Sequence, residues 1–251
     1  MDTPRRPWWV VTAAVAVALV ALAAVGRLQG EGQLPGATRS TAGSTDGIAA
    51  ASGLRVAGRV PLPGEPANVA VGEGAVWVLL QDGVLLRVDP DRHQVTGRVE
   101  VGRPDGGPLA GPLAVGEGAV WVGVPDRDGE ETIRVDPVSL RVTARFGGHV
   151  WAAAHGTLWS YCCRRGQNVT GFGRVDAGTL RPRPPLVVTD RSGRRQPVGP
   201  FAVGPDAVWA VQPPEGERVW RVPLGGGAAR AVRVSDRVWG LAVDASAAWV
   251  L

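Results

Sequence analysis

Residues 69–78 read VAVGEGAVWV, and residues 113–122 repeat this segment as LAVGEGAVWV. Related copies occur at 201–210 and 241–250, and a degenerate copy occupies 151–159. Each copy predicts a short strand, a tight turn and a second strand, because the glycines supply the positive φ angles that a two-residue turn requires. An internal repeat of this kind constrains the fold more strongly than any single motif.

A third and a fourth strand are predicted after each such pair. The third carries Arg-Val-Asp at residues 87–89, 134–136 and 174–176, and the weaker Arg-Val-Pro at 221–223. The fourth is clearest at residues 95–99. Four strands in about 40 residues are typical of a propeller blade. We therefore expect an all-β fold, a β-propeller of four-stranded antiparallel blades, with about four complete blades and further partial ones.

A tryptophan follows an alanine by seven residues in all five copies. The five repeat tryptophans are Trp77, Trp121, Trp159, Trp209 and Trp249. Both faces of a blade pack on neighbouring blades, so a large ring at a fixed repeat position suits the space between blades. A row of tryptophans can also form a ligand platform, but the fixed position favours packing between blades.

Residues 54–60 match the predicted outer strand at 140–146, yet no inner strands precede them. Residues 247–251 fall within the second strand of a fifth unit. These two features predict an incomplete ring across residues 54–251, with unpaired strand edges. We expect the sequence to be truncated.

Residues 8–26 form a run of 19 positions without a charged side chain. As a helix this run would reach roughly 28 Å, close to the hydrocarbon thickness of a bilayer. Two arginines lie in residues 1–7, so we expect a cytoplasmic N-terminus, a transmembrane anchor and an exported remainder. The alternative is a cleaved signal peptide, because residues 21–23 read Ala-Leu-Ala, and the propeller would then be secreted. Residues 27–53 are expected to be a flexible linker.

The composition limits the class of partner. The 27 basic residues are all arginine, and the 23 acidic residues are interleaved with them, which gives a net charge of +4. This balance argues against nucleic acid as a partner. A hydrophobic content of 45% also argues against a disordered chain.

The pattern Ala-Val-Gly-Glu-Gly-Ala-Val-Trp-Val followed by Arg-Val-Asp-Pro resembles the YVTN-type and the streptogramin (virginiamycin B) lyase-like β-propellers of bacteria. The resemblance covers about residues 54–251 and concerns residues that build blades. The resemblance to the lyase-like group implies a seven-bladed ring that uses a histidine base and a bound magnesium. His93, His149 and His155 do not match that catalytic set, so we assign no catalytic residue. We expect no cofactor, except a divalent metal under the lyase alternative.

The connections on the two faces of the predicted propeller differ in their variability. Turns between first and second strands and between third and fourth strands keep their length, whereas the other connections vary. A scaffold carries its site on variable loops, so we expect the ligand on that face. The variable connections are residues 81–83, 103–111, 124–132, 161–171, 188–199 and 212–218.

Two segments of these connections supply the candidate ligand-binding residues. They are Asp126, Arg127, Asp128, Tyr161, Cys162, Cys163 and Arg164. The acidic segment resembles a calcium loop without the full ligand spacing, so we assign no metal ligand. The two adjacent cysteines pair with each other, stay reduced or link chains. Residues 181–195 carry five arginines that either face an anionic polymer or are simply solvated.

The sequence favours a binding module over an enzyme. The first hypothesis is a membrane-tethered extracytoplasmic propeller that binds a protein, glycan or small molecule on its variable face. Titratable groups that could form an acid–base pair are sparse there, which disfavours catalysis. The alternatives are a lyase-like enzyme whose catalytic residues lie in missing C-terminal blades, and a structural partner in an envelope complex.

Overall fold

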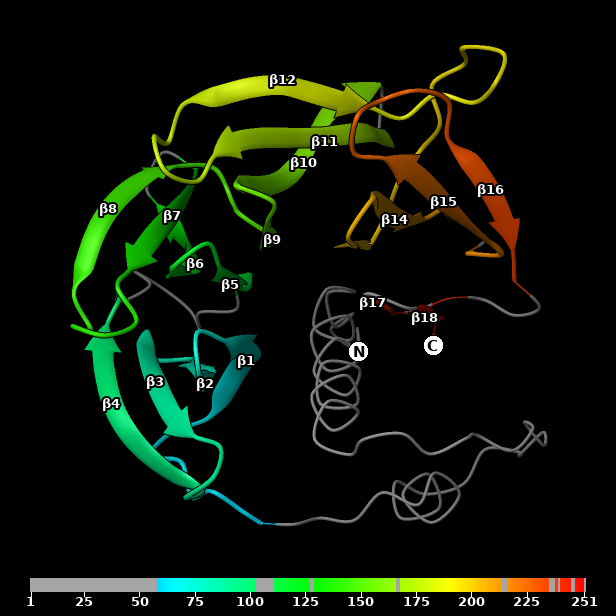
Figure 1. The fold of residues 1–251 in the computed structure, drawn as a ribbon. Helices are drawn as coiled ribbons and strands as arrows, with labels where there is room; N and C mark the ends of the chain where they lie inside the picture. Colours follow the sequence, from blue (N-terminus) through cyan, green and yellow to red (C-terminus); the bar gives the residue numbers. More distant parts are fainter. Residues whose placement is uncertain are drawn as a thin grey trace, which may run out of the picture.

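The computed structural model describes residues 58–250 except 103–110, 127–128, 166–167, 214–215, 235–237, 239 and 245–246. Over these residues the chain is all-β, with four four-stranded antiparallel sheets and one two-stranded sheet. The sheets lie side by side as blades along an arc, with the first strand of each blade innermost (Figure 1). The predicted four-stranded propeller blades are therefore confirmed.

Each blade uses its strands in chain order from inside to outside. Blade 1 comprises β1 (Pro66–Gly72), β2 (Ala75–Leu80), β3 (Val84–Asp89) and β4 (Gln94–Glu100). Blade 2 comprises β5 (Leu113–Gly116), β6 (Ala119–Asp126), β7 (Gly129–Val135) and β8 (Val142–Gly147). Blade 3 comprises β9 (Ala152–Ala154), β10 (Thr157–Arg165), β11 (Asn168–Asp176) and β12 (Pro182–Val187). Blade 4 comprises β13 (Phe201–Val203), β14 (Ala207–Val211), β15 (Arg218–Pro223) and β16 (Arg230–Arg233). The last sheet pairs β17 (Leu241–Val243) with β18 (Ala248–Val250).

The inner hairpins form because two consecutive residues adopt positive φ. Glu73 and Gly74 have φ angles of 50° and 71°, and the equivalent residues in blades 2 and 3 behave alike. This pair of angles suits a two-residue turn between twisted strands. Gly72 has a separate role, because a Cβ there would lie 2.6 Å from Cγ1 of Val115 in the next blade. The repeated glycine at this position thus lets neighbouring inner strands approach closely.

One row of side chains crosses each blade from the axis outwards. The inner alanine pairs with the repeat tryptophan, as in Ala114 opposite Trp121. The tryptophan then pairs with the arginine of Arg-Val-Asp, as in Trp121 opposite Arg134. The same tryptophan–arginine pairing occurs in blades 1, 3 and 4. The recurrence of the arginine in Arg-Val-Asp therefore matches the recurrence of tryptophan on the neighbouring strand.

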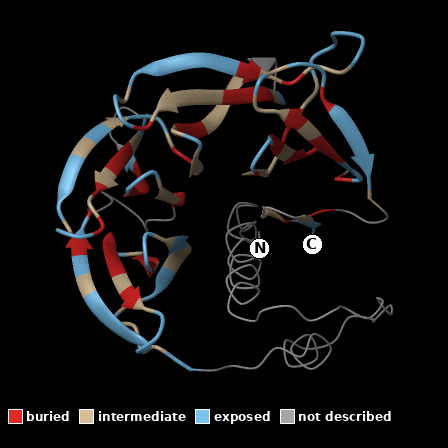
Figure 2. Ribbon diagram, in the orientation of Figure 1, coloured by how far each residue is buried: buried red, intermediate tan, exposed pale blue. Residues whose placement is uncertain are grey.

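The core lies between the blades. Trp77 packs with Val122 and Ile133 of blade 2, and Trp121 packs with Leu158 of blade 3. Outer strands such as β4, β8 and β16 are largely exposed, whereas the middle strands are buried (Figure 2). Trp77 and Trp121 are therefore each shielded by the blade that follows.

Exposure of the repeat tryptophans increases along the arc. Trp77 and Trp121 are 0% exposed and Trp159 is 2% exposed. Trp209 is partly buried against Leu241 and neighbouring apolar residues. Trp249, on β18, is 47% exposed. The burial of each ring thus depends on how much sheet covers it.

The outer strand predicted at residues 54–60 is absent from the part that the structure describes, because residues 58–60 form no strand. Val60 and Leu62 instead pack on the side of blade 1 that faces away from blade 2. Pro61 and Pro63 lack the N–H groups that a ladder needs, which explains why this segment does not pair as a strand.

The predicted anchor at residues 8–26 and the linker at 27–53 lie outside the described residues. Over the residues that are described, the chain has no helix with the length and apolar character needed to span a bilayer.

Candidate functional site

One face of the propeller, the fixed face, carries the inner hairpin turns and the turns between third and fourth strands. Here the aspartate of Arg-Val-Asp caps each outer turn. Asp176 Oδ1 accepts the backbone N–H groups of Gly178 and Thr179 at 3.1 and 2.7 Å, and Asp89 and Asp136 do the same in blades 1 and 2. Backbone hydrogen bonds hold the pKa values of all three carboxyls below their usual range. These aspartates are structural.

Neighbouring inner turns on the fixed face are also tied together. The Glu73 carboxylate accepts the backbone N–H of Gly118 in blade 2 at 3.0 Å. His155 Nε2 lies 2.8 Å from the carbonyl oxygen of Gly204 in blade 4. This face is therefore built from repeated turns and their mutual contacts.

The opposite face, the variable face, is dominated by the hairpins of blades 2 and 3. Strands β6 and β10 contain 8 and 9 residues, whereas β2 and β14 contain 6 and 5. All four begin directly after an inner turn, so the additional residues lie at the variable face. At about 3.3 Å per residue, the two longer hairpins project roughly 7–10 Å beyond that of blade 1. The connections predicted as loops at 124–132 and 161–171 are thus mostly strand.

The connection between β8 and β9 lies between these two hairpins and is anchored to blade 2. Gly148 N–H donates to the Glu130 carbonyl at 2.6 Å. Thr132 Oγ1 donates to the Gly148 carbonyl at 2.6 Å and accepts the Val150 N–H at 3.1 Å. His149 places Nε2 3.3 Å from the Val124 carbonyl and Nδ1 3.5 Å from the Glu130 carboxylate. The segment is therefore held rigidly.

The same connection carries Trp151 to the hairpin of blade 3. Trp151 is 43% exposed, and its ring meets the Tyr161 ring edge-on at a centroid distance of 5.3 Å. Tyr161 in turn contacts Phe201 of blade 4 at 5.1 Å and donates its hydroxyl to the Gly199 carbonyl at 3.1 Å. Burial raises the pKa of Tyr161, so the phenol stays neutral. Trp151 is thus an exposed ring on a fixed support.

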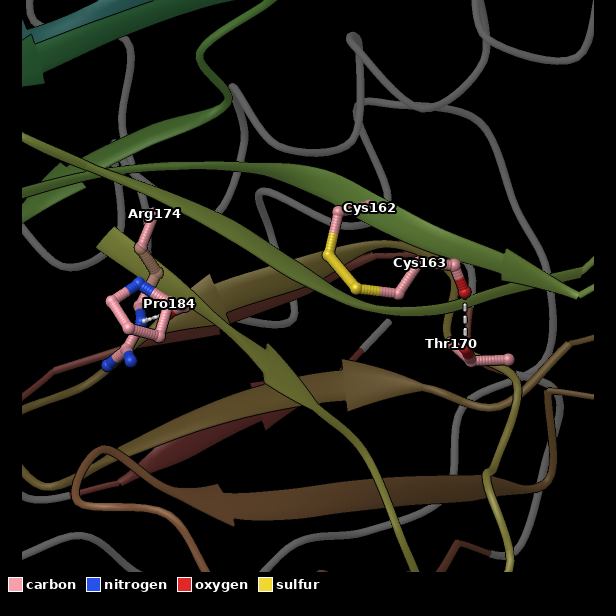
Figure 3. Close-up of a disulfide and its surroundings, with 5 residues drawn as sticks. All are labelled: Cys162, Cys163, Thr170, Arg174 and Pro184. Carbon is pink, nitrogen blue, oxygen red and sulfur yellow. Dashed lines mark hydrogen bonds between the residues drawn. A yellow bond between two sulfur atoms is a disulfide. The ribbon is translucent and has the colours of Figure 1, made fainter. Parts of the chain in front are cut away.

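Cys162 and Cys163 form a disulfide on β10 (Figure 3). Cys162 pairs with Gly171 in the ladder, and pairing resumes at Arg164 opposite Val169. Cys163 has a φ of 62° and is skipped by the ladder. The Thr170 hydroxyl donates to the Cys163 carbonyl across this interruption. The disulfide therefore sits within the projecting hairpin and outside the core between blades.

The structure brings the two predicted segments to neighbouring hairpins. Asp126 ends β6 opposite Gly129, while Arg127 and Asp128 lie outside the described residues. Tyr161, Cys162, Cys163 and Arg164 all lie on β10. We call the described residues of 124–132, 148–151 and 161–170 the two-hairpin site.

Sequence reasoning missed Trp151, His149 and Glu130. Trp151 occupies the repeat position that holds Val69 and Leu113 in blades 1 and 2. A tryptophan at a position otherwise taken by smaller apolar residues was the available signal. No sequence signal indicated the pairing of His149 with Glu130, because this pairing depends on how far the blade 2 hairpin extends.

The three histidines are all engaged in packing or hydrogen bonds. His149 and His155 contact carbonyl groups, as described above. The His93 ring lies against Gly58, where a Cβ would approach its Cδ2 to 2.9 Å. Among the described residues, no three His, Cys, Asp or Glu side chains gather into a possible metal site.

The connection at 188–199 has its two ends at the blade 3 hairpin, where the N–H groups of Val188 and Val198 donate to the carbonyls of Thr170 and Val169, but its middle extends outwards. Its residues 189 and 195 pair as an isolated bridge, and the Thr189 carbonyl accepts the N–H of Ala229, which precedes β16, at 2.8 Å. The segment therefore lies on the outer side of the arc, between blades 3 and 4 (Figure 1). The five arginines of 181–195 therefore do not form one group. Arg183 pairs with Asp176, whereas Arg191, Arg194 and Arg195 lie in the 188–199 segment.

Comparisons with known proteins find similarity in fold alone. No family model matches the sequence. No curated protein is significantly similar to it. Similar solved structures include the RRP9 WD40 repeats, with 9% identity, 76% of this chain and 74% of that chain covered, and a TM-score of 0.49. U3-55K shows 8% identity, 76% and 75% coverage and a TM-score of 0.48. The computationally designed protein Ika8 shows 13% identity, 73% and 54% coverage and a TM-score of 0.48. The assignment as a β-propeller rests on this chain's own strand order and blade packing.

Proposed function

We propose that this protein is a membrane-tethered extracytoplasmic β-propeller that binds a protein partner at the two-hairpin site. The observation that carries the proposal is Trp151, which is 43% exposed yet fixed against Tyr161. Exposed aromatic rings on rigid supports are the usual anchors of protein interfaces, because little side-chain entropy is lost on binding. The projecting hairpins supply polar groups around this anchor, which completes the anatomy of a docking surface.

Membrane tethering and export are supported by the uncharged run at residues 8–26 and the arginines before it. Export also suits a chain whose two cysteines form a disulfide, because such bonds persist in oxidising compartments. A binding role needs no cofactor.

Site-specific photocrosslinking in intact cells tests the proposal. A photoreactive amino acid at Glu130, whose side chain is 63% exposed beside His149, is expected to capture a discrete protein partner. The matched control is Val138 on the fixed face, which is 90% exposed and is expected to yield no such adduct. Trp151→Ala in the Glu130 probe background is expected to reduce the adduct about tenfold.

Equal adducts from both faces, or an adduct that survives Trp151→Ala unchanged, would contradict the two-hairpin site. A glycan or small-molecule ligand is expected to leave both positions without a protein adduct.

A further inference from the structure

Residues 188–196 form a small hairpin on the outer side of the arc, which we call the arginine hairpin. Thr189 and Arg195 pair across it, and Gln196 N–H donates to the Val188 carbonyl at 2.8 Å. The turn closes through Gly193 N–H to the Asp190 carbonyl at 3.0 Å. Figure 1 shows this segment projecting from the arc beyond β12.

The Asp190 carboxylate organises the turn and is fully used by it. Oδ1 accepts the N–H and the hydroxyl of Ser192 at 2.9 and 2.6 Å and the N–H of Arg194 at 3.0 Å. Oδ2 accepts the Gln196 side-chain amide at 2.7 Å. The hydroxyl of Ser192 is the chief cause of the lowered pKa of this carboxyl. Asp190 therefore stays charged, and its hydrogen bonds fix the loop backbone.

The base of the hairpin is fixed in the core. Val188 and Val198 are 0% and 3% exposed, and both pack between blades 3 and 4. Their N–H groups donate to the carbonyls of Thr170 and Val169, each at 2.9 Å. A buried base and a capped turn leave the hairpin little freedom to rearrange.

Three arginines are displayed on this frame. Arg191, Arg194 and Arg195 are exposed, and none forms an ion pair with a carboxylate among the described residues. Elsewhere in the blades, arginines such as Arg92 and Arg145 pair with Asp89 and Glu131 at 2.8 Å. The nearest acid in sequence, Asp190, has its oxygens occupied by the loop. The hairpin thus carries three arginines against a single carboxylate, which the turn itself engages.

We propose that the arginine hairpin is a second docking surface, which meets the two-hairpin site only at its base and binds an acidic segment of a partner protein. Guanidinium groups match carboxylates with paired hydrogen bonds, and a preformed frame lowers the entropy cost of binding. Residues 188–196 contain no aromatic ring on which a base could stack, and a projecting turn offers no groove for a polymer backbone. Carboxylates on a protein segment therefore fit better than a nucleic acid.

Binding of a fluorescent octaglutamate peptide to the detergent-solubilised full chain tests this proposal. Replacing Arg191, Arg194 and Arg195 by Ser is expected to weaken binding about tenfold or more. The matched control replaces Arg141, Arg181 and Arg233, which are also exposed, by Ser. This control removes the same charge and is expected to change affinity by less than about twofold.

The Asp190→Ala variant distinguishes peptide binding to a preformed surface from peptide binding through net positive charge alone. It makes the protein more positive, yet it is expected to weaken peptide binding severalfold because the turn loses its caps. Asp190→Asn, which keeps the side-chain shape, serves if the alanine variant fails to fold. Tighter binding by either folded variant, or an equal loss in the control triple variant, would overturn the proposal.

Inorganic polyphosphate is the competing probe. Polyphosphate that binds more tightly than the peptide through the same arginines would assign the surface to a phosphate polymer and overturn the protein assignment. Photocrosslinking at Glu130 is independent of this hairpin, so failure here leaves the two-hairpin site untouched.

Discussion

In the four complete blades, each repeat tryptophan lies opposite an alanine on the inner strand and an arginine on the third strand, and it packs against the sheet that follows. The Arg134 guanidinium lies 5.6 Å from the Trp121 ring centroid, within the range of a cation–π contact. The indole N–H also has a partner, since Trp121 Nε1 donates to the Gly116 carbonyl at 3.0 Å. One residue thus ties together the inner turn, the blade and its neighbour.

Trp121→Ala is expected to lower the free energy of unfolding by about 3–5 kcal/mol, because it opens a cavity at a fully buried position. Trp249→Ala, at a position that is 47% exposed, is expected to cost less than about 1 kcal/mol. Urea unfolding followed by far-ultraviolet circular dichroism measures both. Similar losses at the two positions would show that these rings are not stabilised by the following blade.

At the scale of the secondary-structure elements, the capped turns of the fixed face make stability depend on pH. The pKa values of Asp89, Asp136 and Asp176 lie below the ordinary value of 3.8, chiefly because backbone N–H groups donate to the carboxylates. A carboxyl whose pKa falls on folding stabilises the fold fully above its unfolded value. That contribution is lost as the pH falls through the lower, folded value.

We therefore expect stability to be constant above about pH 5 and to fall progressively below about pH 4. Asp176→Asn is expected to flatten this decline, whereas Asp91→Asn, at an exposed neighbour that caps no turn, is expected to leave it unchanged. Thermal unfolding between pH 2 and pH 7 supplies the measurement. An unaltered acid decline in Asp176→Asn would contradict the role assigned to the cap.

The disulfide hairpin gives a second prediction at this scale. Cys162 and Cys163 are expected to react with an alkylating agent only after reduction, as mass spectrometry of the purified protein would show. Replacing both by Ser is expected to leave the unfolding midpoint nearly unchanged, because the pair lies outside the core between blades. Alkylation without a reductant would show free thiols instead.

The inner hairpins and the Arg-Val-Asp strands were predictable because each repeats with a fixed spacing. The lengths of β6 and β10 were not, since ladders there continue beyond the repeat and depend on pairing between neighbouring strands. The segment at 54–60 resembled an outer strand, but the prolines at 61 and 63 favour packing of Val60 and Leu62 on blade 1. The position of the 188–199 segment depended on long-range contacts that the sequence does not signal, from Ala229 to Thr189 and from Val198 to Val169.

At the scale of the whole molecule, the proposed membrane tether gives the chain an orientation that can be tested. Protease added outside intact cells is expected to digest the propeller, while cytoplasmic proteins remain intact. Deletion of residues 1–26 is expected to move the protein into the cytoplasmic soluble fraction. Protection from external protease in cells with a permeable outer envelope would reverse the proposed topology.

The graded exposure of the repeat tryptophans also gives the molecule a set of internal optical reporters. Indole fluorescence shifts to longer wavelengths when the ring meets water. Trp77 and Trp121 are fully shielded by the blade that follows each of them, whereas Trp249 already meets solvent. Detachment of one blade would therefore redden the emission of the tryptophan in the blade before it and leave more distant rings unchanged. Single-tryptophan variants would show, blade by blade, the order in which the propeller comes apart.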